Sequence, residues 1–266
     1  MIVPIVVILI IFIIYIFLVA PKNNDDIAKY KNVRFAHRGL HNSERAENSM
    51  SAFRAAVEKG YGIELDIRLS KDGELVVFHD DTLDRVCGRE GNVIDFTADE
   101  LAEFNLSGTD DCIPRFADVL ALVDGRVPLL VEIKENAGDS SVSHAACKML
   151  ADYSGEFIVE SFNPLSLRIV KKELPGVTRG ILSHRYYDYT PYRKPLYFLL
   201  QSLLFNFLCR PAFIAYDHRH ANAFGLRFVR WLFGITTFAW TVRSAEDEKI
   251  ARENGFDSVI FENYLS

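Results

Sequence analysis

Acidic side chains recur at alternate positions in two short apolar runs of the sequence. Glu64 and Asp66 share one run, and Glu132 shares a second with Lys134. Residues two apart in a β-strand point to the same side, so each run places its charges on one face. Three carboxylates converging from two strands repel one another, and a hard divalent cation relieves that repulsion. Oxygen-only ligands predict Mg²⁺ or Ca²⁺, with Mn²⁺ as a further option.

Two histidine-containing pairs close other β-rich runs. His37-Arg38 ends the run at 33–37, and His79-Asp80 follows the run at 75–78. Each pair alone could be a capped strand end or a structural hydrogen-bonded pair, and a single Glu-x-Asp is usually solvent-facing or salt-bridged. Their joint occurrence at the carboxyl ends of strands points to an active site, because barrel enzymes place their chemistry there.

Short β-rich runs alternate with helical patterns from residue 33 onward. The runs lie at 33–37, 63–69, 75–78, 128–133, 157–160, 178–182, 212–216, 236–242 and 257–261, and the helical patterns near 48–59, 140–154, 163–173, 192–208, 221–232 and 244–254. This alternation predicts a parallel sheet with helical crossovers, and eight units predict a closed TIM (β/α)₈ barrel over 33–266. A doubly wound open sheet is the alternative. No GxGxxG or GxxxxGK[ST] motif follows a strand, which argues against nucleotide binding.

The stretch 80–114 interrupts this rhythm. It is polar and glycine-bearing, and it follows an early strand where a barrel has a βα-loop. Long loops in that position usually form the lid or wall of the site. We therefore predict an inserted segment after the second main strand.

The amino-terminal segment differs from the rest of the chain. Residues 1–20 carry no ionisable side chain, and the sequence becomes polar directly afterwards. Twenty helical residues span about 30 Å, the thickness of a bilayer core. The pattern predicts a transmembrane anchor over 1–21 and a linker over 22–32. Basic residues follow the anchor and none precedes it, which predicts a single-pass membrane protein with a cytoplasmic catalytic domain.

A second apolar stretch at 186–208 combines leucines at helical spacing with several tyrosines and phenylalanines. An outer barrel helix should be polar on its exposed face. Burial under a loop and a dimer contact are two interpretations, and a second membrane contact beside that of residues 2–20 is the third.

The amino-acid composition excludes several classes of protein. The chain has 266 residues, with 30 basic and 36 acidic side chains and a formal net charge of −6. Half-apolar composition excludes a disordered or collagen-like chain. Without a basic excess, no nucleic acid partner is expected. The four cysteines have wide spacings and no CxxC pair, so neither a zinc knuckle nor a dense disulfide framework is indicated.

Several motifs follow one another in a fixed order. They are Phe35-Ala36-His37-Arg38-Gly39, Glu47-Asn48-Ser49, Ile63-Glu64-Leu65-Asp66, Lys71-Asp72-Gly73, His79-Asp80, Val131-Glu132-Ile133-Lys134, Ser161-Phe162-Asn163 and Trp240-Thr241-Val242. In this order and spacing the chain resembles the glycerophosphodiester phosphodiesterases over about residues 33–263. One departure is Glu262-Asn263, which stands where the family commonly has a Thr-Asp pair.

The resemblance implies a TIM barrel and a role for each matching residue. The metal ligands would be Glu64, Asp66 and Glu132, the acid–base pair His37 and His79, the phosphate-binding residues Arg38 and Lys134, and the residues at the mouth Glu47 and Asn48. From their positions at strand ends, Phe162 and Trp240 either form an apolar wall against a glycerol or acyl group or pack in the barrel core. Glu47 would orient His37 or belong to the metal shell.

The implied function is metal-dependent hydrolysis of glycerophosphodiesters to an alcohol and glycerol 3-phosphate or a related phosphomonoester. The nucleophile would be water or a glycerol hydroxyl. Lysophospholipase D action on membrane lysophospholipids is the alternative, favoured by the apolar segments. A non-catalytic, lipid-phosphate-binding membrane module is a second alternative, and the filled catalytic positions argue against it.

Overall fold

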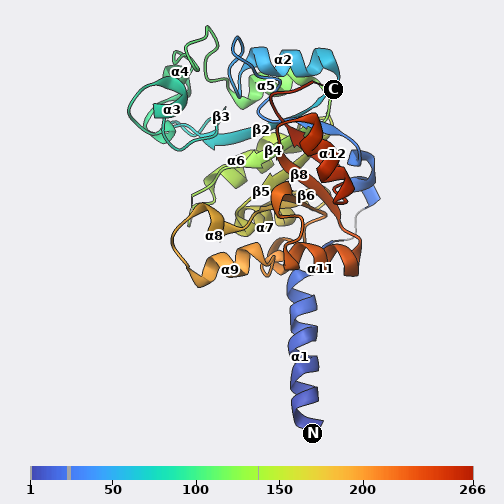
Figure 1. Cartoon of the computed structure of the whole chain (residues 1–266). Coiled ribbons are helices and arrows are strands. Elements are labelled where there is room, and N and C mark those ends of the chain that lie inside the picture. Colours follow the sequence, from blue (N-terminus) through green and yellow to red (C-terminus); the bar gives the residue numbers. More distant parts are fainter. Residues whose placement is uncertain (1, 23–24, 137, 266) are drawn as a thin grey trace.

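Eight parallel strands close into a barrel in the computed structural model, which describes residues 2–22, 25–136 and 138–265 (Figure 1). β1 pairs with both β2 and β9, which closes the eight-stranded barrel. The predicted TIM barrel is confirmed, and the open sheet is excluded. A further strand, β3 (Leu75–Val77), lies antiparallel to the end of β2. The barrel strands are β1 (Arg34–Ala36), β2 (Gly62–Leu69), β4 (Leu129–Ile133), β5 (Phe157–Ser161), β6 (Arg179–Ser183), β7 (Phe213–Asp217), β8 (Thr236–Val242) and β9 (Ser258–Phe261).

Helices follow most of the strands and cover the outside of the barrel (Figure 1). They are α2 (Met50–Lys59), α5 (Phe116–Val123), α6 (Ser141–Ala151), α7 (Pro164–Glu173), α8 (Tyr186–Tyr189), α9 (Pro195–Gln201), α10 (Asn206–Cys209), η3 (His218–His220), α11 (Phe224–Phe233) and α12 (Ala245–Glu253). Buried apolar side chains of these helices face the outer side of the sheet, which leaves the inner side for a separate core and for the site.

The inner core lies below the site. It contains Phe35, Leu130, Ile158, Leu182, Phe213, Phe238 and Ile260. Ile27 and Tyr30 of η1 (Asp25–Tyr30) pack against the same cluster. Part of the predicted linker over 22–32 is therefore core, because these two apolar side chains gain burial there. Residues 23 and 24 of that linker lie outside the described residues, as do 1 and 266.

The turn after β1 is fixed by its packing on α2. Gly39 has φ +80°, and a Cβ on it would lie 2.9 Å from the Cβ of Ala52. Ser49 caps α2 by accepting a hydrogen bond from the main-chain N–H of Ala52. A left-handed, closely packed position favours glycine, so this turn holds the preceding His37 and Arg38 at the barrel mouth.

The segment between β3 and α5 has a small core of its own. It contains α3 (Asp84–Cys87), η2 (Val93–Asp95) and α4 (Ala98–Leu101). Its buried residues include Leu83, Val86, Leu101, Phe104 and Ile113, which pack on Phe78 after β3. The segment is thus a packed unit beside the barrel mouth rather than an extended loop (Figure 1).

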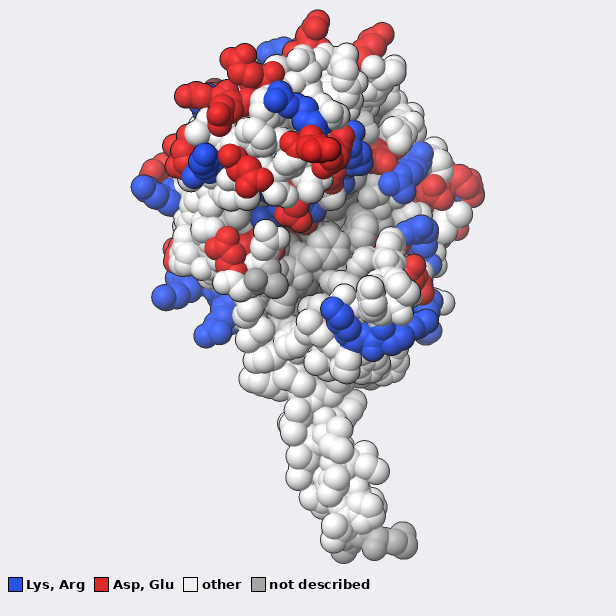
Figure 2. Space-filling model, turned by 90° about the vertical axis from the view of Figure 1, so that its left-hand side faces the viewer, with Lys and Arg blue, Asp and Glu red and all other residues white. Residues whose placement is uncertain are grey.

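The amino-terminal helix α1 (Ile2–Val19) projects from the barrel, and Figure 2 shows no charged side chain on it. Its 18 residues rise about 27 Å. Its end rests on the barrel, since Val19 is buried and the Tyr15 ring lies 5.0 Å from that of Phe228. No helix among the described residues combines the length and apolarity needed to cross a membrane. The predicted single-pass membrane localisation is therefore wrong, and the predicted transmembrane anchor over 1–21 has no support.

The physical reason is the docking of the last turns of α1. Asn206 donates a hydrogen bond to the carbonyl of Val19, and Arg210 donates one to that of Phe17. These contacts make the end of α1 part of the packing of the barrel, which local hydropathy does not show. The prediction of a cytoplasmic catalytic domain rested on the anchor and loses its basis.

The apolar stretch 186–208 is not one helix. It divides into α8, α9 and α10, and Leu203 between the last two has φ +61° and is buried. The backbone of Ser202 lies so close to Gly225 of α11 that a Cβ there would be 3.0 Å from the Ser202 oxygen. Tyr186 stacks on Tyr197 at 5.6 Å. These contacts give the predicted second membrane contact no support.

Candidate active site

Four acidic side chains lie inside the barrel near the carboxyl ends of neighbouring strands. Asp66 on β2 is in register with Glu132 on β4, which is in register with Glu160 on β5. Glu64 lies two residues before Asp66 and shares its side of β2. All four residues are buried. The sheet register therefore gathers these carboxylates in one part of the barrel.

Three of these residues form a tight cluster. One carboxylate oxygen each of Glu64, Glu132 and Glu160 lies within 4.8 Å of the other two. Burial raises the pKa of Glu132 to about 7, and burial with the neighbouring carboxylates raises the pKa of Glu64 and Glu160 well above the ordinary range. These carboxylates repel one another, and the positive side chains nearby do not balance their charge. Such a group of oxygen ligands fits a divalent cation.

Asp66 is surrounded by donors. Lys134 Nζ lies 3.2 Å from Oδ1 of Asp66 and 2.7 Å from Oε1 of Glu132. Asn48 donates a hydrogen bond of 2.8 Å to Oδ2 of Asp66, and Arg38 Nε lies 3.5 Å from the same oxygen. Burial opposes ionisation of Asp66, yet the positive neighbours, Lys134 first among them, hold its pKa well below the ordinary value.

His37 is held between two carboxylates. Its Nδ1 lies 2.6 Å from Oε2 of Glu262, just after β9, and its Nε2 lies 4.0 Å from Oε2 of Glu64. Burial lowers the pKa of His37, and the hydrogen bond with Glu262 opposes that shift. A proton on Nδ1 is thus directed to Glu262, which leaves Nε2 facing the acidic cluster.

His79 has a similar arrangement. Its Nδ1 lies 2.6 Å from Oδ1 of Asp80, and Arg85 of α3 donates a hydrogen bond of 2.6 Å to the other oxygen of Asp80. Burial, with the charges of Lys134 and Arg38, lowers the pKa of His79 to about 4, and the charge of Asp66 opposes this shift. His79 therefore interacts electrostatically with Asp66, Lys134 and Arg38.

Arg38 and Glu47 form an ion pair at the mouth. Arg38 Nη1 lies 2.6 Å from Oε1 of Glu47, and Arg85 binds both oxygens of Glu47. The main-chain N–H of Arg38 donates to Oε2 of Glu64 at 2.9 Å. Burial opposes the shift, but both arginines lower the pKa of Glu47 to about 2. Glu47 therefore contacts Arg38 and Arg85, and its described hydrogen bonds do not include His37.

Aromatic side chains also lie at the mouth of the barrel. Phe162 after β5 and Trp240 of β8 lie 5.6 Å apart, edge to face. His184 packs between these rings and Tyr186, at 5.5 Å from Phe162 and 4.2 Å from Tyr186. Lys134 Nζ lies 6.0 Å from the centre of the Phe162 ring, which connects this wall to the charged residues.

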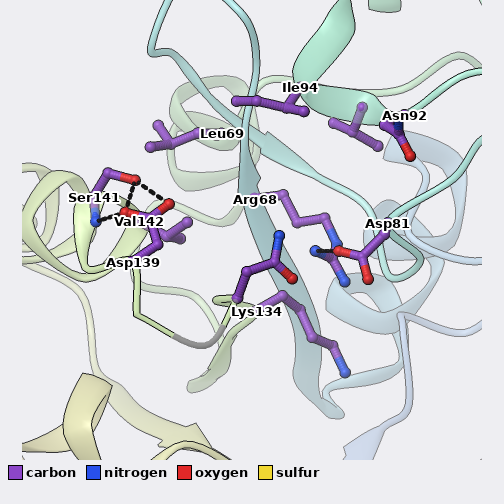
Figure 3. A pocket seen from close by; sticks show the side chains of 11 residues that line it. Arg68, Leu69, Asp81, Asn92, Ile94, Lys134, Asp139, Ser141 and Val142 are labelled. Carbon is purple, nitrogen blue, oxygen red and sulfur yellow. Dashed lines mark hydrogen bonds and ion pairs between the residues drawn. The ribbon is translucent and has the colours of Figure 1, made fainter.

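A cavity adjoins Lys134 on the side of the inserted segment. It has a volume of about 310 Å³, and Lys134 lines it together with residues of β2, of the inserted segment and of the start of α6. Figure 3 shows Arg68 paired with Asp81 on one wall and Asp139 bound to Ser141 on the other. Lys134 is thus the residue that the cavity shares with the acidic cluster, and both charged and apolar side chains line the rest of it.

Four of these contacts were not predicted from the sequence. Glu262 was noted only as a departure from the family pattern, and Glu160 was passed over beside Ser161-Phe162. Asp80 is a motif residue without a predicted role, and Arg85 lies within the predicted inserted segment 80–114. Spacing along one strand identifies side chains that share a face, whereas these contacts join residues of different elements. The positions of Glu160 and Glu262 at strand ends were the available signals.

Glu262→Gln is expected to lower kcat about 10- to 100-fold with little change in KM, because an amide no longer fixes the proton of His37 on Nδ1. The hydrogen bond with Glu262 raises the pKa of His37, so the limb of the pH–rate profile governed by His37 should move to lower pH. Steady-state kinetics over pH 5–9 measure both effects.

Glu262→Asp should recover part of the rate, and Glu253→Gln at the exposed end of α12 is the matched control. An unchanged profile in Glu262→Gln would show that Glu262 does not position His37.

Comparisons with known proteins point to one family. The model of the Glycerophosphoryl diester phosphodiesterase family matches residues 37–265. A glycerophosphodiester phosphodiesterase from Caldanaerobacter subterraneus subsp. tengcongensis is 32% identical over 243 residues, covering 86% of this chain and 93% of the relative.

Two solved structures share the fold. A glycerophosphodiester phosphodiesterase from Thermotoga maritima has a TM-score of 0.66 at 28% identity, over 86% of this chain and 94% of that one. A phosphodiesterase from Oleispira antarctica, solved with the product sn-glycerol-3-phosphate, has a TM-score of 0.72 at 20% identity, over 88% and 94% of the two chains.

Proposed function

The chain belongs to the glycerophosphoryl diester phosphodiesterase family, and we propose that the residues at the carboxyl end of its barrel perform the reaction. It is a glycerophosphodiester phosphodiesterase, which hydrolyses its substrate to an alcohol and a phosphomonoester. One observation supports the site assignment above the others. Two histidines, each bound to a carboxylate through Nδ1, interact electrostatically with one buried group of acidic residues.

Glu64, Asp66 and Glu132 are the proposed ligands of a single divalent cation, Mg²⁺ or Ca²⁺, with Mn²⁺ as a third option. Their oxygens suit a hard cation, and their burial makes an uncompensated charge costly. When bound, such a cation would offset the negative charge that develops on the phosphoryl oxygens. Lys134 pairs with Glu132 and Asp66 and so remains next to that position.

Arg38 and Lys134 are the proposed phosphate-binding side chains. Both are half-buried beside the acidic group and keep their positive charge, since the neighbouring carboxylates raise the pKa of each against the effect of burial. Donors fixed in advance stabilise charge as it develops, without reorganisation. Asn48 and Glu47 support them, because Asn48 binds Asp66 and Glu47 binds Arg38.

His37 and His79 are the proposed acid–base pair. The Nε2 atom of one accepts the proton of the attacking hydroxyl, and that of the other donates a proton to the leaving alcohol oxygen as its P–O bond breaks. With water as the nucleophile the phosphomonoester forms directly. With a glycerol hydroxyl a cyclic phosphate forms first and water then opens it, so a transient cyclic phosphate in ³¹P spectra separates the two routes.

The cavity beside Lys134 supports a small polar alcohol as the leaving group. Arg68, Asp81, Asn136 and Asp139 line it together with Leu69, Val93, Ile94 and Val142, so it offers charged and hydrogen-bonding groups to a head group. The aromatic wall of Phe162 and Trp240 supports the second candidate, lysophospholipase D action, because an acyl-bearing glycerol could pack there.

A substrate panel tests this function. The purified chain is supplied with Mg²⁺, Ca²⁺ or Mn²⁺ and with glycerophosphocholine, glycerophosphoethanolamine or lysophosphatidylcholine. We expect the chain to release the alcohol from the two glycerophosphodiesters with a higher kcat/KM than from lysophosphatidylcholine. Faster release of choline from lysophosphatidylcholine would favour lysophospholipase D. No release with any metal would overturn the proposal and favour a non-catalytic module that binds lipid phosphate.

A further inference from the structure

Glu160 is a buried acid that forms no ion pair with the described residues. It lies on β5 inside the barrel, only 1% of its surface is exposed, and its Oε2 has no hydrogen-bond partner. Lys134 forms its ion pairs with Glu132 and Asp66. Burying an unpaired carboxylate costs free energy, and a bound cation would offset that cost.

The position of Glu160 identifies that partner. The strand register sets it directly beside Glu132, and one of its oxygens lies within 4.8 Å of oxygens of Glu64 and Glu132. Ca²⁺ binds oxygens at about 2.3–2.6 Å, so two ligands on opposite sides of it lie about 5 Å apart. The three oxygens are therefore close enough together to bind one ion.

We propose that Glu160 is a further ligand of the divalent cation, and that this extra carboxylate selects Ca²⁺ over Mg²⁺. The inference rests on the proposed function, which places the ion between Glu64, Asp66 and Glu132. Ca²⁺ takes six to eight oxygen ligands in flexible geometry, whereas Mg²⁺ usually binds through one or two carboxylates and keeps several waters. A site that offers four carboxylates suits the larger ion.

Metal binding by the full chain tests this assignment without an activity assay. After chelation, the protein is titrated with Tb³⁺, an oxygen-seeking probe of similar size to Ca²⁺, and with Ca²⁺ and Mg²⁺ by calorimetry. Luminescence lifetimes in H₂O and D₂O count the waters on bound Tb³⁺. Glu160→Ala should add one or two waters and weaken Ca²⁺ binding at least 10-fold, while Mg²⁺ binding changes less.

Two further variants make the test decisive. Glu160→Gln keeps the side-chain volume and removes an unpaired buried acid, so it should fold in chelator while binding Ca²⁺ more weakly. Glu156→Gln, just before the opposite end of β5 and exposed, is the matched control and should bind as the original chain does.

The outcomes separate the two proposals. If the original chain binds the ion and hydrolyses the substrate, but water count, affinity and selectivity are unchanged in both Glu160 variants, Glu160 is not a ligand. If the original chain binds no divalent ion and hydrolyses nothing, the proposed function itself fails.

Discussion

His37→Ala and His79→Ala each lower kcat by at least about 10²–10⁴-fold, the range that general acid–base catalysis contributes. Each variant lacks the Nε2 atom that exchanges a proton with the substrate. His37 reaches Glu64 and Glu262, and His79 reaches Asp80, so the two side chains have separate partners. Initial rates on glycerophosphocholine at a saturating concentration of the preferred cation measure the loss.

His144→Ala is the matched control, because His144 lies on the outer helix α6 and pairs with Glu173. Circular dichroism and the melting temperature show whether each variant is folded. A folded His37→Ala or His79→Ala protein with a rate close to that of the original chain would refute the acid–base assignment.

Chelation of divalent ions is expected to remove activity by about 10³-fold or more, since such an ion contributes several kcal/mol to charge stabilisation. It should also change how stability depends on pH. Burial raises the pKa of Glu132 to about 7 in the folded chain, above its ordinary value of 4.5. Between these values the folded chain binds more protons than the unfolded chain, so stability falls as pH rises through 7.

The histidines limit the pH window in which this effect is visible. The pKa of His79 is about 4 in the folded chain and 6.5 unfolded, so His79 makes stability rise with pH up to about 6.5. Above that pH, the carboxylates rather than His79 determine how stability changes with pH. The melting temperature of the chelated protein should therefore fall between pH 6.5 and 8.

A bound cation replaces those protons, so the increase in melting temperature caused by Ca²⁺ or Mg²⁺ should be larger at pH 8 than at pH 6.5. Glu132→Gln should reduce the difference. Equal increases at both pH values, or full activity after chelation, would contradict the assignment of the carboxylates to a metal site.

The barrel and the side chains that share its strands were predictable from local sequence. Alternation of strands and helices gives the parallel sheet, and the i, i+2 spacing of Glu64 with Asp66 and of Glu132 with Lys134 places each pair on one face. The barrel is confirmed. The domain boundaries and the roles of the site residues stay predictions, because no comparison tests them.

The errors share a physical cause. Hydropathy along 1–20 is the same whether a helix crosses a bilayer or ends on another helix. The hydrogen bond between Asn206 and Val19 joins residues far apart in the sequence, so only the folded chain shows it. Glu262 could not be paired with His37 from a sequence separation of 225 residues. Closure of β9 against β1 brings the two together.

The central claim is that carboxylates of β2 and β4 hold one divalent cation with a histidine on either side. Crystals of the chelated chain soaked in Mn²⁺ would locate that ion by its anomalous scattering. The account predicts a peak within about 2.0–2.6 Å of oxygens of Glu64 and Glu132, with His37 and His79 flanking it. A peak bound to other residues, or none at this cluster in a protein that hydrolyses its substrate, would contradict it.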